Sequence, residues 1–181
     1  MYEVISNSLK ELEQGKNIVL ATVVNTKGST PQKIGSKLQY FPINNWQNEI
    51  SIAQKIGFKY IEWIVSDYSN PIFNQIFQKQ ILQLLRKNNI KISSISLDLL
   101  MREPLFKIQH DDLDWILFNL KIILRRFKIK RVNIPLEENS KVSNYYDFKV
   151  VKNRLQKIIK IIGSSSKISI ESDLSLENLN H

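Results

Sequence analysis

The chain has 181 residues, of which 43% are hydrophobic and 24% charged, and it contains no cysteine. This length and apolar content suffice for a buried core, which excludes disordered, collagen-like and disulfide-stapled proteins. Without cysteine, thiol catalysis, thiolate metal sites and disulfide redox chemistry are excluded. The sequence has no run of about 18 apolar residues and no signal-peptide pattern, so we expect a cytoplasmic protein with no membrane partner.

The chain is basic, with 26 lysines and arginines against 17 acidic residues and a formal net charge of +9. The densest basic cluster comprises Lys121, Arg125, Arg126, Lys128, Lys130 and Arg131. It follows an amphipathic helical pattern whose other face holds Ile122, Ile123 and Phe127. This arrangement favours a solvated helix face, and no zinc spacing or RNA-binding motif accompanies it, so we do not expect a nucleic-acid partner. A basic nucleic-acid module stays open as an alternative, which salt-sensitive retention on DNA or RNA would support.

The first part of the chain predicts three elements. Apolar residues recur at helical spacing over residues 3–14, and the run IVLATVV at 18–24 has the composition of a buried strand. A loop rich in polar residues, NTKGSTPQKIG, follows that strand. A second helix is predicted over 46–56, with Gly57 at the position typical of a helix stop.

Beyond Gly57 the pattern alternates regularly between strands and helices. Strands are predicted at 60–65, 91–97, 130–134 and 167–171. Helices are predicted at about 72–87, 111–127 and 147–162. Strands joined by crossover helices must be parallel, so the sequence predicts an α/β fold of barrel or doubly wound type.

Acidic and polar residues follow the predicted strands, where parallel α/β proteins bind their ligands. The candidate substrate-binding residues are Glu62, Trp63, Asp98, Glu137, Glu138 and Asn139, and Glu171 ends the last predicted strand. Oxygen acceptors at one rim suit a divalent cation or a polyhydroxylated substrate. Alternatively, these side chains are helix caps and first-turn residues. His110 is predicted to be a loop residue.

Four segments together resemble the sugar phosphate isomerase/epimerase family with the xylose isomerase-like TIM barrel. They are FPINNWQNEISIAQKIGFKYIEWIVSDYSNP at 41–71, KISSISLDLLMREPL at 91–105, RVNIPLEENS at 131–140 and KISIESDL at 167–174. The order, spacing and strand position of these segments agree with the family, and the resemblance extends over residues 38–181.

The resemblance implies an eight-stranded barrel that binds a divalent metal and moves a proton at a carbon beside a sugar carbonyl. It places the catalytic and first metal-ligating carboxylate on Glu171. Glu62 corresponds in this resemblance to the acidic residue of the second strand that faces the substrate. Residues 137–139 correspond to the polar end of the fourth strand. The substrate implied is a sugar or a sugar phosphate.

The N-terminal segment resembles a different family. The run IVLATVVNTKGSTPQKIGSKL, with Gly28, Ser29, Thr30, Pro31 and Gly35, is similar to the start of the XdhC/CoxI family. Members of that family are accessory proteins that help to mature molybdenum-cofactor enzymes. The expected domains are therefore an XdhC/CoxI-like fragment at 1–37 and a truncated barrel at 38–181 that comprises about the first five βα units.

Truncation carries several expectations. A partial barrel lacks the metal ligands of strands six to eight, so we expect the isolated chain to bind no divalent metal and to be inactive. Its two open sheet edges favour self-association. The family's own first strand is expected to be missing, and IVLATVV at 18–24 is predicted to replace it by pairing with 60–65. The alternative function is that of an XdhC-like accessory protein for a molybdenum-cofactor enzyme.

Overall fold

The computed structural model of this chain describes residues 37–42, 46–163 and 165–172. The helix predicted at 3–14 and the strand predicted at 18–24 lie outside these ranges. The described residues form a five-stranded sheet in the order β1-β2-β3-β4-β5, and all four neighbouring pairs are parallel. The predicted α/β class is thus confirmed.

The strands are β1 (Lys37–Tyr40), β2 (Tyr60–Ile64), β3 (Lys91–Ser96), β4 (Arg131–Leu136) and β5 (Lys167–Ser172). The α-helices are α2 (Trp46–Ile56), α3 (Gln75–Lys87), α4 (Leu99–Arg102), α5 (His110–Phe127) and α6 (Tyr145–Ile162). Two short 3-10 helices, η1 (Pro71–Phe73) and η2 (Glu138–Ser140), precede α3 and α6. The predicted strands and long helices from residue 46 onward are confirmed to within three residues at each end, the largest difference being the start of α3. The short helix α4 was not predicted, and His110, predicted to be in a loop, is the first residue of α5.

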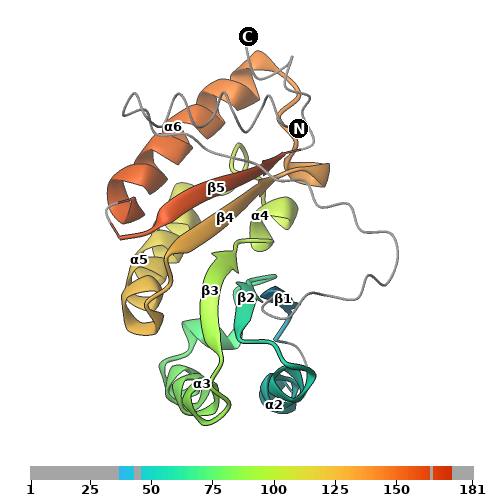
Figure 1. Cartoon of the computed structure of the whole chain (residues 1–181). Helices are drawn as coiled ribbons and strands as arrows, with labels where there is room; N and C mark the ends of the chain where they lie inside the picture. The colour runs from blue at the N-terminus through green and yellow to red at the C-terminus, as the bar shows by residue number, and fades with distance from the viewer. Residues whose placement is uncertain (1–36, 43–45, 164, 173–181) are drawn as a thin grey trace, which may run out of the picture.

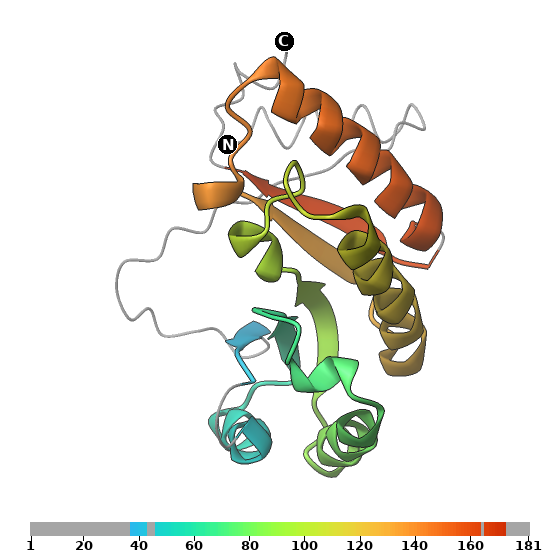
Figure 2. The same ribbon diagram turned by 180° about the vertical axis from the view of Figure 1, so that it is seen from behind.

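One long helix follows each of the first four strands before the next strand begins. The helices α2, α3, α5 and α6 all lie on the same side of the curved sheet, as the two opposite views in Figures 1 and 2 show. This is the architecture of a partial (β/α)8 barrel, with five strands in sequential order and helices on the outside. Among the described residues, the sheet does not close, because β1 and β5 each pair with a single neighbour.

The first strand of the sheet is β1, and this corrects two predictions. Residues 37–40 pair with β2 in the register Lys37 to Tyr60 through Tyr40 to Trp63, so a first strand is present. The other edge of β2 pairs with β3. A strand has two edges for hydrogen bonding, so the predicted pairing of 18–24 with β2 is wrong.

The end of α2 follows directly from its glycine. Gly57 has a φ of +100°, and its N–H donates to the Gln54 carbonyl while the Phe58 N–H donates to the Ala53 carbonyl, both at 3.0 Å. This pair of bonds closes the helix and requires a left-handed residue, which glycine adopts without a steric penalty. The predicted helix stop is confirmed.

A β-bulge sets which side chains of β3 face which way. Ile61 pairs with Ile92, but the next residue, Glu62, pairs with Ser94, so Ser93 is an extra residue in β3. The bulge lets Ile92 and Ile95 both face the helices while Ser94 faces the opposite side of the sheet. The alternation of a strand then places the apolar residues on the helix side.

The hydrophobic core lies between the sheet and its helices. Fully or nearly fully buried side chains on this side of the strands are Tyr40, Ile61, Trp63, Ile95, Val132 and Ile134. They pack against buried residues of the helices such as Ile50, Ile81, Leu120 and Ile158. The basic face predicted for α5 is exposed, as expected. Ile122 was predicted to lie on the buried apolar face, but its side chain is 42% exposed. No helix in the described ranges combines the length and the apolar character needed to cross a membrane.

Candidate active site

The side of the sheet opposite the helices is polar. Its inward-facing residues, by register, are Gln39, Glu62, Ile64, Ser94, Ser96, Asn133, Pro135, Ser169 and Glu171. A barrel interior is ordinarily filled with bulky branched side chains. Here hydroxyl, amide and carboxylate groups occupy most of these positions, so this inner face is suited to binding a polar molecule.

Glu62 is the centre of a hydrogen-bonded cluster on the inner face. Its Oε1 accepts from the Ser94 hydroxyl at 2.5 Å and from the Asn133 amide at 2.5 Å. The three side chains come from β2, β3 and β4, and each is at most 6% exposed. A carboxylate can be buried in this way only when donors compensate the water that it loses. The cluster therefore fixes the orientation of the Glu62 carboxylate.

Asp98 lies just beyond β3, and the structure places it near two other acidic groups. Its Oδ1 accepts from the Ser96 hydroxyl at 2.6 Å. Burial raises the pKa of Asp98, the negative charges of Glu62 and Glu138 raise it further, and the Ser96 hydrogen bond lowers it. Asp98 occupies the N-cap position of α4, as the alternative expected, but its side chain makes no capping hydrogen bond.

The three residues predicted after β4 lie around η2. Glu137 is half-buried, whereas Glu138 and Asn139 are exposed, and Glu138 has a φ of +51°. The buried Ser140 hydroxyl anchors this turn by donating to the Pro135 and Glu137 carbonyls at 3.0 and 2.8 Å. Since α4 contacts η2, this turn lies beside the Asp98 end of β3.

Glu171 is on β5, at the far edge of the described sheet. It pairs in register with Pro135 and is half-buried, and it follows Ser169, the register partner of Asn133. Its register places it on the inner face, and its catalytic and metal-ligating role stays a prediction. It is not among the groups that shift the pKa of Asp98.

Trp63 lies on the other side of β2 from Glu62. Its side chain is fully buried, its ring centroid is 4.9 Å from that of Tyr40, and its indole N–H donates to Asn70 Oδ1 at 2.9 Å. Successive residues of a strand face opposite sides of the sheet, so Trp63 and Glu62 cannot share one cavity. Trp63 therefore belongs to the hydrophobic core, and its prediction as a substrate-binding residue is wrong.

Ser94, Ser96 and Asn133 belong to the site, and the sequence analysis missed them. Their signal is the alternation of polar residues with buried apolar ones along β3 and β4, as in Ser94 and Ser96 flanking Ile95. In a strand covered on both faces by apolar packing, such polar positions would be unexpected. They mark the inner face as polar.

The donor set does not fit a divalent cation. Within residues 37–42, 46–163 and 165–172, no group of three or more histidine, aspartate or glutamate side chains is placed to hold a metal ion. Glu171 is one carboxylate, and catalytic cations are ordinarily held by several protein ligands. We therefore derive no step through a metal from the described residues.

Comparison with protein families and curated proteins gives one short match. Residues 11–44 match the model of the XdhC and CoxI family. This match overlaps β1, so the matched segment continues into the first strand of the sheet. No curated protein matches the chain.

Comparison with solved structures gives matches over the barrel-like part. A D-psicose 3-epimerase from Clostridium cellulolyticum H10, solved with D-tagatose, is 11% identical, with a TM-score of 0.54 over 73% of this chain and 50% of its own. The probable 3-DHS dehydratase AsbF from Bacillus anthracis, involved in petrobactin synthesis, is 16% identical, with a TM-score of 0.50 over 74% of this chain and 51% of its own. The likeness is one of fold, and this chain spans about half the length of these proteins.

Proposed function

We propose that this chain binds a sugar on the polar inner face of its sheet, within a barrel of the sugar isomerase/epimerase type. The observation that carries this proposal is the Glu62 cluster, in which Ser94 and Asn133 hold a buried carboxylate on the face that barrels ordinarily fill with apolar side chains. Sugar hydroxyls require closely spaced donors and acceptors, which such a face supplies. The likeness in fold to a D-psicose 3-epimerase supports the same class.

The charges of the site favour an uncharged sugar over a sugar phosphate. Glu62 and Glu138 both raise the pKa of Asp98, which means that the three acidic groups share one electrostatic environment. A phosphate brought to the same rim would be repelled by these carboxylates. We therefore propose a neutral sugar with a carbonyl group as the substrate class.

We propose that Asp98 carries the proton in the reaction. A carboxyl group whose pKa is raised by burial is a stronger base than an ordinary aspartate, and Ser96 fixes its position. It would remove the proton from the carbon beside the carbonyl and leave an enediolate. Return of that proton to the former carbonyl carbon, with transfer of the neighbouring hydroxyl proton to the former carbonyl oxygen, gives an isomer. An epimer forms when a water molecule instead supplies a proton to the opposite face of the original carbon. The role that the resemblance implies for Glu171, as catalytic carboxylate and metal ligand, remains a proposal for the complete barrel.

The proposal is tested with D-psicose and D-tagatose as probes. Saturation-transfer NMR on the purified chain should detect binding of at least one of them at millimolar concentration. Glu62→Gln should weaken this binding by about tenfold, because it weakens a charge-assisted contact. The matched control is Asp114→Asn, whose side chain is 53% exposed on the outer helix α5 and should leave binding unchanged. Absence of binding by both sugars, or equal binding by Glu62→Gln, would reject the proposal.

The proton step has its own readout. In D2O, with or without added Mg2+ or Mn2+, a competent chain should incorporate deuterium beside the sugar carbonyl. Asp98→Asn should retain sugar binding and lose this exchange. Binding without exchange in the unsubstituted chain rejects the role of Asp98 in proton transfer and leaves the binding proposal intact.

A second candidate function follows from the family match at residues 11–44. We propose, as the alternative, an accessory role toward a molybdenum-cofactor enzyme. The test is the molybdenum content of the chain purified from cells grown with molybdate. Stoichiometric molybdenum that is lost in Pro31→Ala, together with no binding of either sugar, would favour the accessory function over the sugar-binding function.

A further inference from the structure

A cavity lies at the end of the sheet opposite the Asp98 rim. It has a volume of about 300 Å3 and is lined by Leu82, Leu85, Arg86, Asn89, Ile90, Lys91, Ile92 and Phe127. These residues come from the end of α3, the turn after it, the start of β3 and the last residue of α5. The cavity is therefore separate from the inner face, because it lies between two outer helices and the helix side of β3.

The floor of this cavity is apolar and built by the fold. Leu85, Ile90, Ile92 and Phe127 are each at most 8% exposed. Ile92 reaches the helix side of β3 because of the bulge at Ser93. A cavity of about 300 Å3 with an apolar floor is large enough for a small aromatic or branched ligand.

The mouth of the cavity is cationic. Arg86 lines it and is exposed. Lys91 also lines the cavity, but it precedes Ile92 on β3, so its side chain faces the opposite side of the sheet. In the part of the chain that the structure describes, no acidic side chain lies on α3 or in the last two turns of α5. The Arg86 guanidinium therefore faces solvent without a carboxylate from its own helix.

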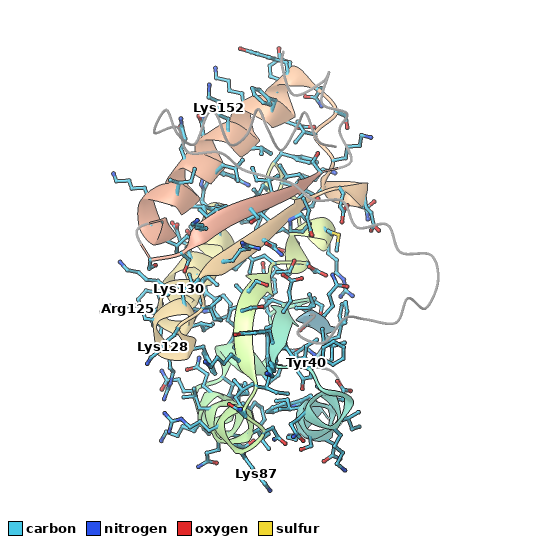
Figure 3. All side chains as sticks on the ribbon, viewed as in Figure 1. Tyr40, Lys87, Arg125, Lys128, Lys130 and Lys152 are labelled. Atoms are coloured by element: carbon cyan, nitrogen blue, oxygen red, sulfur yellow. The ribbon has the colours of Figure 1, made fainter. Side chains whose placement is uncertain are left out.

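The surroundings strengthen this positive field. Figure 3 shows Lys87 at the end of α3, and Arg125, Lys128 and Lys130 around the end of α5. The described acidic residues lie instead at the carboxyl ends of strands, in the loops that follow or in the early turns of helices, apart from Glu62 within β2. Among the described residues, basic side chains therefore gather around the cavity, whereas most acidic side chains lie toward the Asp98 end, and such a distribution attracts anions to the cavity.

From this combination we infer a binding site for an amphipathic anion, with an apolar body on the Leu85, Ile92 and Phe127 floor and an acidic group at Arg86. A carboxylate, sulfonate or phosphate would each satisfy this cation. Arg86 offers a planar set of donors that suits an oxyanion. The site does not depend on sugar binding at the inner face, because no residue is shared between the two.

The experiment uses a pair of probes with the same aromatic body. Anilinonaphthalene sulfonate carries an anionic group, and phenylnaphthylamine is its neutral counterpart. Fluorescence titration of the full chain should give saturable binding of the anionic probe. Arg86→Gln should raise its dissociation constant by about tenfold, because a charge-assisted contact is lost. The dissociation constant of the neutral probe should be the same for Arg86→Gln and the unsubstituted chain.

The matched control is Lys87→Gln, which removes a neighbouring charge that does not line the cavity. It should change the dissociation constant of the anionic probe by less than about twofold, since exposed charges contribute little individually. Leu82→Trp, which fills the cavity from its half-buried wall, should abolish binding of both probes. Equal weakening by Arg86→Gln and Lys87→Gln would identify a diffuse polyanion-binding surface and overturn the inference. Unchanged binding by Leu82→Trp would also overturn it, and circular dichroism of each variant checks that it is folded.

Discussion

Asn133 on β4 donates a 2.5 Å hydrogen bond to Glu62 on β2, across the intervening strand β3 and 71 positions along the chain. Ser94 on β3 donates to the same oxygen, so a single carboxylate oxygen joins three neighbouring strands. The bond depends on the sheet being formed in its observed register, because Ser96 must pair with Asn133 and Glu62 with Ser94. The polar inner face is therefore a consequence of tertiary structure.

This relationship predicts the effect of Asn133→Ala. The substitution leaves a buried carboxylate with one donor fewer, and we expect the free energy of unfolding to fall by about 1 to 3 kcal/mol. Urea denaturation followed by circular dichroism measures it. Asn119→Ala is the control, since the Asn119 amide bonds only the Trp115 carbonyl on the surface of α5 and should cost less than about 1 kcal/mol. Equal costs for the two variants would contradict the role of Asn133.

The raised pKa of Asp98 predicts a pH dependence of stability. Because the folded chain holds the proton more tightly than the unfolded chain, ionisation of Asp98 costs stability as the pH rises above the ordinary aspartate value of 3.8. Asp98→Asn keeps the Oδ1 acceptor for Ser96 and removes this cost. The difference in unfolding free energy, Asp98→Asn minus the unsubstituted chain, should therefore be larger at pH 7 than at pH 3. The same difference in unfolding free energy at both pH values would contradict the shift.

Glu138 supplies a second check on the same carboxyl group. Its charge raises the pKa of Asp98, so Glu138→Gln should lower that pKa toward its ordinary value. Carbon-detected NMR titration of the Asp98 carboxyl group measures the change. Glu49→Gln, on α2, should leave the titration curve in place, because Glu49 is not among the groups that shift Asp98. A curve that is unmoved by Glu138→Gln would place η2 farther from Asp98 than the structure does.

Trp63 predicts a stability effect without a binding effect. The buried indole N–H bonds Asn70 Oδ1, and Asn70 in turn donates to the Ile64 carbonyl at 2.9 Å. Trp63→Phe removes that donor and leaves a void, at a cost of about 2 kcal/mol in the free energy of unfolding. Trp115→Phe, at a position 43% exposed, should cost less than about 1 kcal/mol. If Trp63→Phe weakened sugar binding while its stability was unchanged, Trp63 would belong to the site after all.

The edge of β5 that no other described strand covers predicts self-association. The Lys167 N–H donates to the Lys130 carbonyl in the β4 direction, so the alternation of the strand turns the Ile168 and Ile170 N–H groups to the other edge. Sedimentation velocity should detect association that grows with concentration, since unpaired edges accept further strands. Ile170→Pro removes one edge donor and should weaken association, whereas Ile170→Ala keeps that donor and controls for lost packing. A monomer at all concentrations would contradict this prediction.

Some of the fold could be predicted because its signals are local. The runs that became β2, β3, β4 and β5 are rich in isoleucine, valine and aromatic residues, and the helical spacing of α5 and α6 extends over five turns each. The glycine after α2 predicted a helix stop because the left-handed conformation suits that residue type. By contrast, β1 and α4 have four residues each, too few for a periodic pattern to stand out.

The candidate site was predictable only in part. The carboxylates after the strands were visible in the sequence, and Glu62 and Glu138 are each near enough to Asp98 to raise its pKa. Trp63 was placed with them because it adjoins Glu62, but adjacent residues of a strand face opposite ways. Ser94 and Asn133 carry no motif, so their part in the site follows from the register of β3 and β4.

The sequence by itself determined the alternation of strands and helices, and with it the α/β class, because periodicity and helix-stopping residues act over a few neighbouring positions. The tertiary structure alone decided which strand lies beside β2, which face of each strand turns inward, and that Ser93 is an extra residue that turns Ile92 toward the helices. The physical reason is that strand pairing, bulges and buried hydrogen bonds join residues far apart in the chain. Their energies depend on three-dimensional register, which no local pattern encodes.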